Sequence, residues 1–175
     1  IQIRGWVWSC GTEGEARRLQ ASAPRGDGGC GPTCAGGNVT RAAFLDTNIV
    51  LHYLLGGDVA KAERCLALLK KADKNEVELH ISELVVAELV WVLQSPRYNF
   101  TRERIRDLIL PVVLLPGVRL ASKGMYSDIF ELYVEKHIDY IDAYNAVVMR
   151  KQGLNDIYSY DKHFDGMPGI QRREP

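Results

Sequence analysis

The sequence predicts an α/β protein, a three-layer α/β/α sandwich around a central, mostly parallel sheet. Short apolar runs typical of strands alternate along the chain with longer segments of helical periodicity, which is the pattern of a parallel sheet covered by helices. The 175 residues, of which 46% are hydrophobic and 25% charged, suffice for one domain with a sizeable core.

The first 40 residues do not share this pattern. They hold nine of the 16 glycines and show neither helix nor strand periodicity, so we expect a flexible leader at residues 1–40 and the folded domain at residues 41–175. Two interpretations of the leader are open: a natural disordered extension, or upstream sequence translated from a misplaced start, with Val39 as the true beginning. Cys30 and Cys34 lack the second Cys/His pair that a zinc site needs.

Turn and capping residues divide the domain into its expected elements. Strands are expected where short runs are apolar or alternate apolar with polar residues: 42–45 (a buried strand), 77–81, 112–115, 118–120, 157–160 and a last one near Ile170. Helices are expected where apolar residues recur at helical spacing behind a capping residue: 48–55, 58–74, 82–94, 102–110, 122–137 and 140–152. Gly56 and Gly153 close two of these helices, and Pro111 is expected to stop a third.

Overall charge and hydropathy limit the classes of function. The 22 basic and 22 acidic residues give a formal net charge of zero, so no overall field indicates nucleic-acid binding. The longest apolar run, from Leu84 to Leu93, is about half the length of a membrane-spanning helix and is interrupted by Glu88. No signal peptide is evident. We therefore expect a cytoplasmic protein that does not contact a membrane.

Glu88 is the only charged residue between Leu84 and Leu93. Its neighbours are apolar on every side of the expected helix, so that helix is predicted to be buried nearly all round. A buried carboxylate is costly unless it is paired or binds a metal ion. Glu88 is therefore expected either to form a salt bridge with a nearby arginine or lysine or to serve a functional site.

Three aspartates stand at the ends of expected elements. Asp46 and Asp161 directly follow strands, at the edge of a parallel sheet where ligands collect, although a turn or a helix cap also explains an aspartate there. Asp142 lies in the first turn of its helix, where a capping or dipole role is the simple explanation. Its neighbours Ala143 and Ala146 indicate that this side of the helix faces inward.

These four acids predict a cation site if they converge. Two like charges about 4 Å apart repel by roughly 4 kcal/mol at an effective dielectric constant of about 20. Such a cluster needs protons or cations to neutralise it, and oxygen ligands favour Mg²⁺ or Mn²⁺. Cations of this kind bind substrate phosphates and activate water for phosphodiester hydrolysis.

Four short motifs carry a family resemblance: Leu45-Asp46-Thr47-Asn48, Glu88-Leu89, Asp142-Ala143, and the run from Ser159 to Phe164. In this order, over about Ala43 to Arg173, they resemble the acidic motifs of PIN-domain nucleases, and most of all those of VapC-type toxins. The resemblance implies a metal-dependent endoribonuclease of a type II toxin–antitoxin system, with Mg²⁺ or Mn²⁺ held by Asp46, Glu88, Asp142 and Asp161. Asn48 and Thr47 would be polar residues that orient these ligands.

The same resemblance implies the partners of the protein. They are an RNA substrate, a VapB-type antitoxin and a second copy of the chain in a homodimer. The apolar surface of that dimer is expected near Leu54 and Leu55 or at Val112 to Leu115.

Several alternatives remain open at this stage. Asp139 competes with Asp142 for the third acidic position, and Asp165 competes with Asp161 for the fourth. His163 lies near the expected site but is predicted to be exposed to solvent.

A phosphatase of the haloacid dehalogenase type requires a second aspartate where Asn48 stands, which disfavours that class of enzyme. A non-catalytic PIN-like module that binds RNA or protein is the second functional hypothesis.

Overall fold

The computed structural model describes residues 42–175, so the expected leader, with Cys30 and Cys34, lies outside the described residues. The strands are β1 (Ala42–Phe44), β2 (Glu78–His80), β3 (Val118–Arg119), β4 (Asp156–Tyr158) and β5 (Gln171–Arg173). The helices are α1 (Thr47–Leu55), α2 (Val59–Asp73), α3 (Glu83–Gln94), α4 (Arg102–Leu114), α5 (Tyr126–Glu135) and α6 (Tyr140–Gln152), with 3₁₀ helices η2 (Lys123–Met125) and η3 (Lys162–Phe164). Within these residues, none of the helices has the length and apolar content that crossing a bilayer requires.

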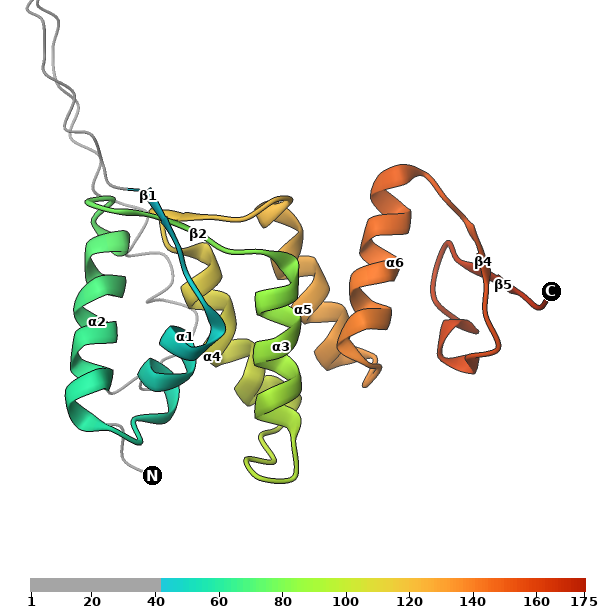
Figure 1. Ribbon diagram of the computed structural model, residues 1–175. Helices are drawn as coiled ribbons and strands as arrows, with labels where there is room; N and C mark the ends of the chain where they lie inside the picture. The colour runs from blue at the N-terminus through green and yellow to red at the C-terminus, as the bar shows by residue number, and fades with distance from the viewer. Residues whose placement is uncertain (1–41) are drawn as a thin grey trace, which may run out of the picture. The chain divides into compact units, whose positions relative to one another are not determined.

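The strands are parallel, as expected, and are divided between two sheets. In the first sheet β2 lies between β1 and β3, and in the second β4 pairs with β5. Figure 1 shows β4 and β5 beyond α6, on the side of that helix away from β1. The predicted α/β class with a parallel sheet is confirmed, and the division into two sheets is a feature that the pattern of strands did not indicate.

Local capping signals place the helix boundaries close to their predicted positions. The side chains of Asp58, Ser82 and Thr101 each accept a hydrogen bond from the backbone N–H three residues later, at the starts of α2, α3 and α4. Gly56 and Gly153 end α1 and α6 with φ of 62° and 70°, in the left-handed region that glycine enters without strain. These boundaries depend on contacts between residues that are close in sequence, so the local sequence predicts them.

Pro111 does not end its helix, contrary to the prediction. Helix α4 continues to Leu114, and the strand expected at residues 112–115 is its last turn. Proline lacks the N–H that would bond to the preceding turn, but Val112 and Val113 are 6% and 1% exposed, and their burial offsets that loss. Within this run Val112 and Val113 belong to the core, whereas Leu114 is 45% exposed. In the other candidate region Leu54 is 6% exposed and Leu55 is half-buried, so the expected dimer surface stays a prediction.

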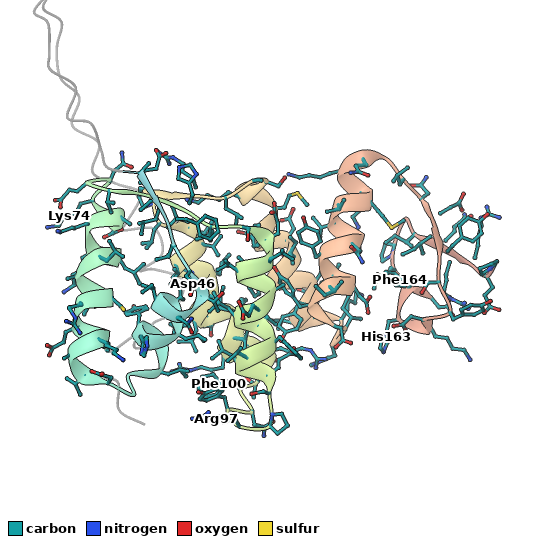
Figure 2. The ribbon with its side chains drawn as sticks, viewed as in Figure 1. Asp46, Lys74, Arg97, Phe100, His163 and Phe164 are labelled. Carbon is teal, nitrogen blue, oxygen red and sulfur yellow. The ribbon has the colours of Figure 1, made fainter. Side chains whose placement is uncertain are left out.

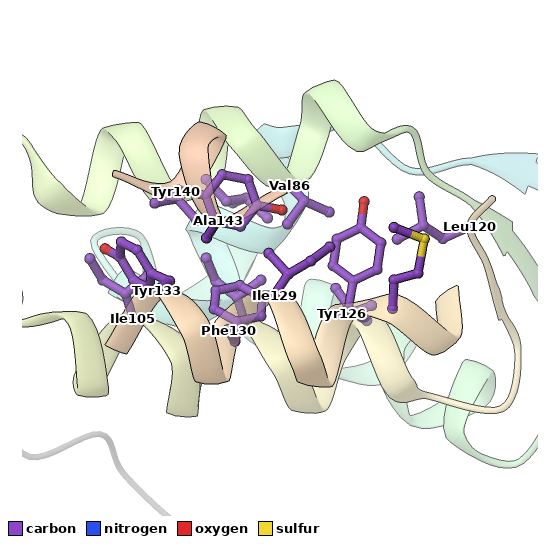
Figure 3. Packing of buried hydrophobic residues seen from close by; sticks show 14 of the residues in the cluster. Val86, Ile105, Leu120, Tyr126, Ile129, Phe130, Tyr133, Tyr140 and Ala143 are labelled. Carbon is purple, nitrogen blue, oxygen red and sulfur yellow. The ribbon is translucent and has the colours of Figure 1, made fainter. Parts of the chain in front are cut away.

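Aromatic packing between α5 and α6 fixes the start of α6. Figure 3 shows Tyr126, Phe130 and Tyr133 of α5 in a row that faces Tyr140 and Ala143 of α6. The ring centroids of Phe130 and Tyr133 lie 5.6 and 6.0 Å from that of Tyr140, distances typical of favourable aromatic pairs. The first turn of α6 is thus held rigidly against the core.

Strand β1 and one side of α3, both expected to be buried, are exposed. The three residues of β1 are exposed, and Phe44 has 65% of its surface accessible. On α3, Leu84, Glu88 and Trp91 form one exposed side at helical spacing, with Leu84 79% and Trp91 76% accessible. The opposite side of α3 packs into the core. The predictions of a buried first strand and of a helix buried all round are therefore wrong, because β1 is an edge strand and α3 lies at the surface.

Candidate active site

Three potential ligands from two distant segments meet at the start of α6. Asp142 lies in the first turn of α6, Asp161 caps η3, and His163 lies on η3. One ligand atom from each of the three lies within 4.8 Å of the others. The Nδ1 atom of His163 is 3.1 Å from Oδ1 of Asp161 and 3.8 Å from Oδ2 of Asp142. The imidazole therefore lies beside both carboxylates.

A tight turn after β4 holds Asp161 in this place. Its backbone N–H donates to Oγ of Ser159 at 2.9 Å, and its own Oδ1 accepts from the backbone N–H of His163 at 2.9 Å. Phe164, the residue after His163, is 3% exposed and packs in the hydrophobic core, which anchors η3. These short-range hydrogen bonds and one buried ring present the carboxylate toward α6.

Asp142 is the most buried member of this group, and its burial affects its pKa. Its side chain is 17% exposed, against 43% for Asp161 and 55% for His163. Burial raises the pKa of Asp142, and the negative charges of Asp161 and Asp139 raise it further, while His163 lowers it in part. A positive charge placed between Asp142 and Asp161 would therefore be strongly favoured.

The donor set fits a hard divalent cation. Two carboxylates, one on a helix and one on a turn, suit Mg²⁺ or Mn²⁺, whereas an imidazole ligand is more typical of zinc, iron, copper or nickel. If the two carboxylates held a hard cation, the His163 imidazole would lie beside them as a neighbouring polar group rather than as a preferred ligand. Partners of this kind orient a ligand and tune its basicity.

A second polar group lies where β1 meets α1. Asp46 caps α1, and its Oδ2 accepts from the backbone N–H of Asn48 at 3.2 Å and from the Asn48 amide at 2.9 Å. Thr47 is 3% exposed, and its hydroxyl donates to Oε2 of Glu88 on α3 at 2.5 Å. Asn48 and Thr47 thus contact the carboxylates of Asp46 and Glu88, and their role in orienting metal ligands stays a prediction.

The four predicted acids are divided between these two groups. Within residues 42–175, Asp142, Asp161 and His163 are the only set of three or more metal-ligating side chains this close together, and it does not include Asp46 or Glu88. Figure 2 shows Asp46 at the end of β1 and His163 beyond α6, well separated in that view. Convergence of all four acids on one ion stays a prediction.

The competing aspartates have other surroundings. Asp165 forms a two-point contact with Arg172, with Nε to Oδ1 at 2.8 Å and Nη2 to Oδ2 at 3.3 Å, and this pairing holds the pKa of Asp165 below its ordinary value. Asp139 is exposed at the N-terminus of α6, where its side chain makes no capping hydrogen bond.

His163 is exposed as predicted, but the sequence analysis did not predict its contact with both acids. Its position two residues after Asp161, in the same motif, was the signal available.

Both groups of acids lie within one family match. The sequence model of the PIN domain matches residues 43–170, most of the chain. The chain belongs to the PIN domain family. This PIN domain is also similar to a VapC ribonuclease from Aquifex aeolicus (strain VF5), with 23% identity over 121 residues, which are 69% of this chain and 88% of the relative. The resemblance drawn from the four motifs is thereby confirmed.

Proposed function

We propose that this PIN domain is a metal-dependent endoribonuclease and the toxin component of a type II toxin–antitoxin system. The observation that carries the proposal is the meeting of Asp142 and Asp161 at the start of α6. Two carboxylates this close, one of them only 17% exposed, repel each other when both are ionised unless a cation neutralises them. Similarity to a VapC ribonuclease supports RNA as the substrate.

Asp46, Glu88, Asp142 and Asp161 are the residues proposed to hold Mg²⁺ or Mn²⁺. When bound, the cation supplies the positive charge that activates water and stabilises the leaving oxygen of the cleaved phosphodiester. Asn48 and Thr47 hold the carboxylates of Asp46 and Glu88 through the hydrogen bonds that they donate. The backbone N–H of His163 donates to Oδ1 of Asp161, and the His163 imidazole lies beside the same oxygen.

The same similarity supports a VapB-type antitoxin as the protein partner. A toxin that cleaves cellular RNA acts in the cytoplasm, where we place the protein. Self-association into a homodimer is part of the proposal.

Cleavage of end-labelled RNA tests the assignment. We expect cleavage in Mg²⁺ or Mn²⁺, loss of cleavage in EDTA, and restoration when Mn²⁺ is added. Asp142→Asn should abolish cleavage, whereas Asp139→Asn, the same change of charge three residues earlier, should retain it. Cleavage that survives EDTA or Asp142→Asn would overturn the proposal. Tight binding of RNA without cleavage in either cation would identify a non-catalytic binding module instead.

A further inference from the structure

A groove lies between helices α1 and α2, which pack side by side (Figure 1). Its volume is about 400 Å³. None of the described residues that line it is an aspartate or a glutamate, although the whole chain carries as many acidic as basic residues. The groove is therefore a positively charged surface on a protein whose formal net charge is zero.

Two cationic side chains of α2 border the groove. Lys61 and Arg64 are exposed and lie three residues apart, on the same side of the helix. In residues 42–175 no carboxylate pairs with Arg64, and Lys61 makes only a long contact with Asp58, with 3.7 Å between Nζ and Oδ2. Exposed pairs of this kind contribute little to stability. Both cations are therefore available to an anionic ligand.

The floor of the groove is apolar. Ile49, Cys65 and Leu68 line it and are buried or half-buried. Such a surface suits a ribose or an unstacked base, which a single strand of nucleic acid presents and a stacked, paired duplex does not. The volume falls within the range of pockets that bind small molecules, about 300–1,000 Å³. The groove therefore has room for a nucleotide of a single strand.

Asn48 connects the groove to the acidic group at the end of β1. It lines the groove, and its amide Nδ2 donates to Oδ2 of Asp46 at 2.9 Å. His52 lines the groove one turn further along the same side of α1. The groove thus leads away from Asp46 along α1. A strand with one phosphate near Asp46 can continue between the two helices.

We propose that this groove binds the backbone of single-stranded RNA next to the bond that is cleaved, with phosphates at Arg64 and Lys61 and a ribose or base on the apolar floor. The choice of RNA rests on the proposed function, whereas the charge and shape of the groove do not. Contacts to phosphates fix the register of a nucleic acid without reading its sequence. Arg64 and Lys61 therefore bind and position the substrate.

Fluorescence anisotropy with a labelled RNA tests the groove. The probe is an unstructured single strand of about 12 nucleotides, and the protein carries Asp142→Asn so that the probe stays intact. In this background Arg64→Gln should weaken binding by about 10-fold, since a charge-assisted hydrogen bond is lost. The slope of log Kd against log salt should fall by about 0.7, the value for one phosphate contact to a single strand. Arg64→Lys keeps the charge and should restore most of the affinity.

The matched control is Arg104→Gln. Arg104 is exposed on α4 and does not line the groove, so the same loss of charge should leave Kd and its salt dependence nearly unchanged. Equal effects of the two substitutions would mean that overall charge and not the groove attracts RNA, which overturns the proposal. RNA affinity that Arg64→Gln leaves unchanged would also overturn it and would leave the groove to a protein partner. A duplex that binds as tightly as the single strand would overturn the role of the apolar floor.

The kinetics of cleavage give a readout that a damaged fold would not imitate. In otherwise wild-type protein, Arg64→Gln should raise KM by about 10-fold with kcat nearly unchanged, because the contact is equally strong before and during the chemical step. A lower kcat at unchanged KM would contradict this binding role. A wild type that leaves RNA intact, while Arg64→Gln still weakens binding, overturns only the nuclease assignment. An active nuclease in which Arg64→Gln alters neither KM nor Kd overturns only the groove.

Discussion

The hydroxyl of Thr47 donates a hydrogen bond to the carboxylate of Glu88, with 2.5 Å between Oγ1 and Oε2. The two residues are 41 positions apart in sequence, and the bond ties the start of α1 to the middle of α3. Thr47 is buried because Asp46, the residue before it, caps α1 at the end of β1. The bond therefore positions an exposed acid from a buried and rigid site.

Removal of this hydroxyl should weaken catalysis more than folding. We expect Thr47→Val to lower RNA cleavage, or the affinity for Mn²⁺, by about 10- to 100-fold, the usual effect of losing a partner that orients a metal ligand. The free energy of unfolding should fall by only about 1 kcal/mol, since one hydrogen bond is lost. Thr47→Ser keeps the hydroxyl and should cleave nearly as well as the wild type. Wild-type cleavage by Thr47→Val would show that Glu88 needs no such support.

Asp142 should destabilise the metal-free protein. Its pKa is raised in the folded state, so its ionised form costs stability at every pH above that raised pKa. Asp142→Asn should therefore raise the melting temperature in EDTA at neutral pH. The gain should disappear as the pH falls through the pKa of Asp142, because the wild-type carboxyl group is then neutral as well.

The matched control for that measurement is Asp139→Asn. Asp139 is exposed and makes no capping hydrogen bond through its side chain, so its replacement should leave the melting temperature nearly unchanged. Equal gains for the two variants would mean that general relief of negative charge, and not the burial of Asp142, is responsible.

Substitutions should show that Asp161 is a catalytic acid and that Asp165 is a structural one. Asp161→Asn should lower cleavage by at least about 100-fold, as expected for loss of a group that stabilises charge in the transition state. Asp165→Asn should leave cleavage near the wild-type rate and lower the melting temperature slightly, because Arg172 loses a carboxylate that it contacts at two points. The reverse pattern in the cleavage assay would assign the fourth acidic position to Asp165.

Divalent cations should stabilise the folded protein. At a concentration 100-fold above its Kd, a cation that binds only the folded state adds about 2.7 kcal/mol to the free energy of unfolding. We expect Mn²⁺ to raise the melting temperature and EDTA to reverse the change. A variant with both Asp142→Asn and Asp161→Asn should show no response. A wild-type melting curve that is the same with Mg²⁺, Mn²⁺ and EDTA would contradict a metal site.

Elements whose boundaries depend on residues close in sequence were predicted correctly, whereas those that depend on distant segments were not. Helix α3 begins after Ser82 and ends at Gln94, as predicted, because capping and the approach of Pro96 act within one turn. Pro111 was predicted to stop α4 by the same local reasoning, which failed because the burial of Val112 and Val113 depends on residues far away in sequence.

By itself the sequence determined the order and type of most elements, several of their capping residues, and the acidic motifs that place this chain among PIN domains. The tertiary structure alone decided that Asp142 rather than Asp139 faces Asp161, that His163 lies beside both, and that Arg172 engages Asp165. It also decided that β1 and one side of α3 are exposed. Periodicity reports which side of an element is apolar, but burial and pairing depend on which distant segments pack against it.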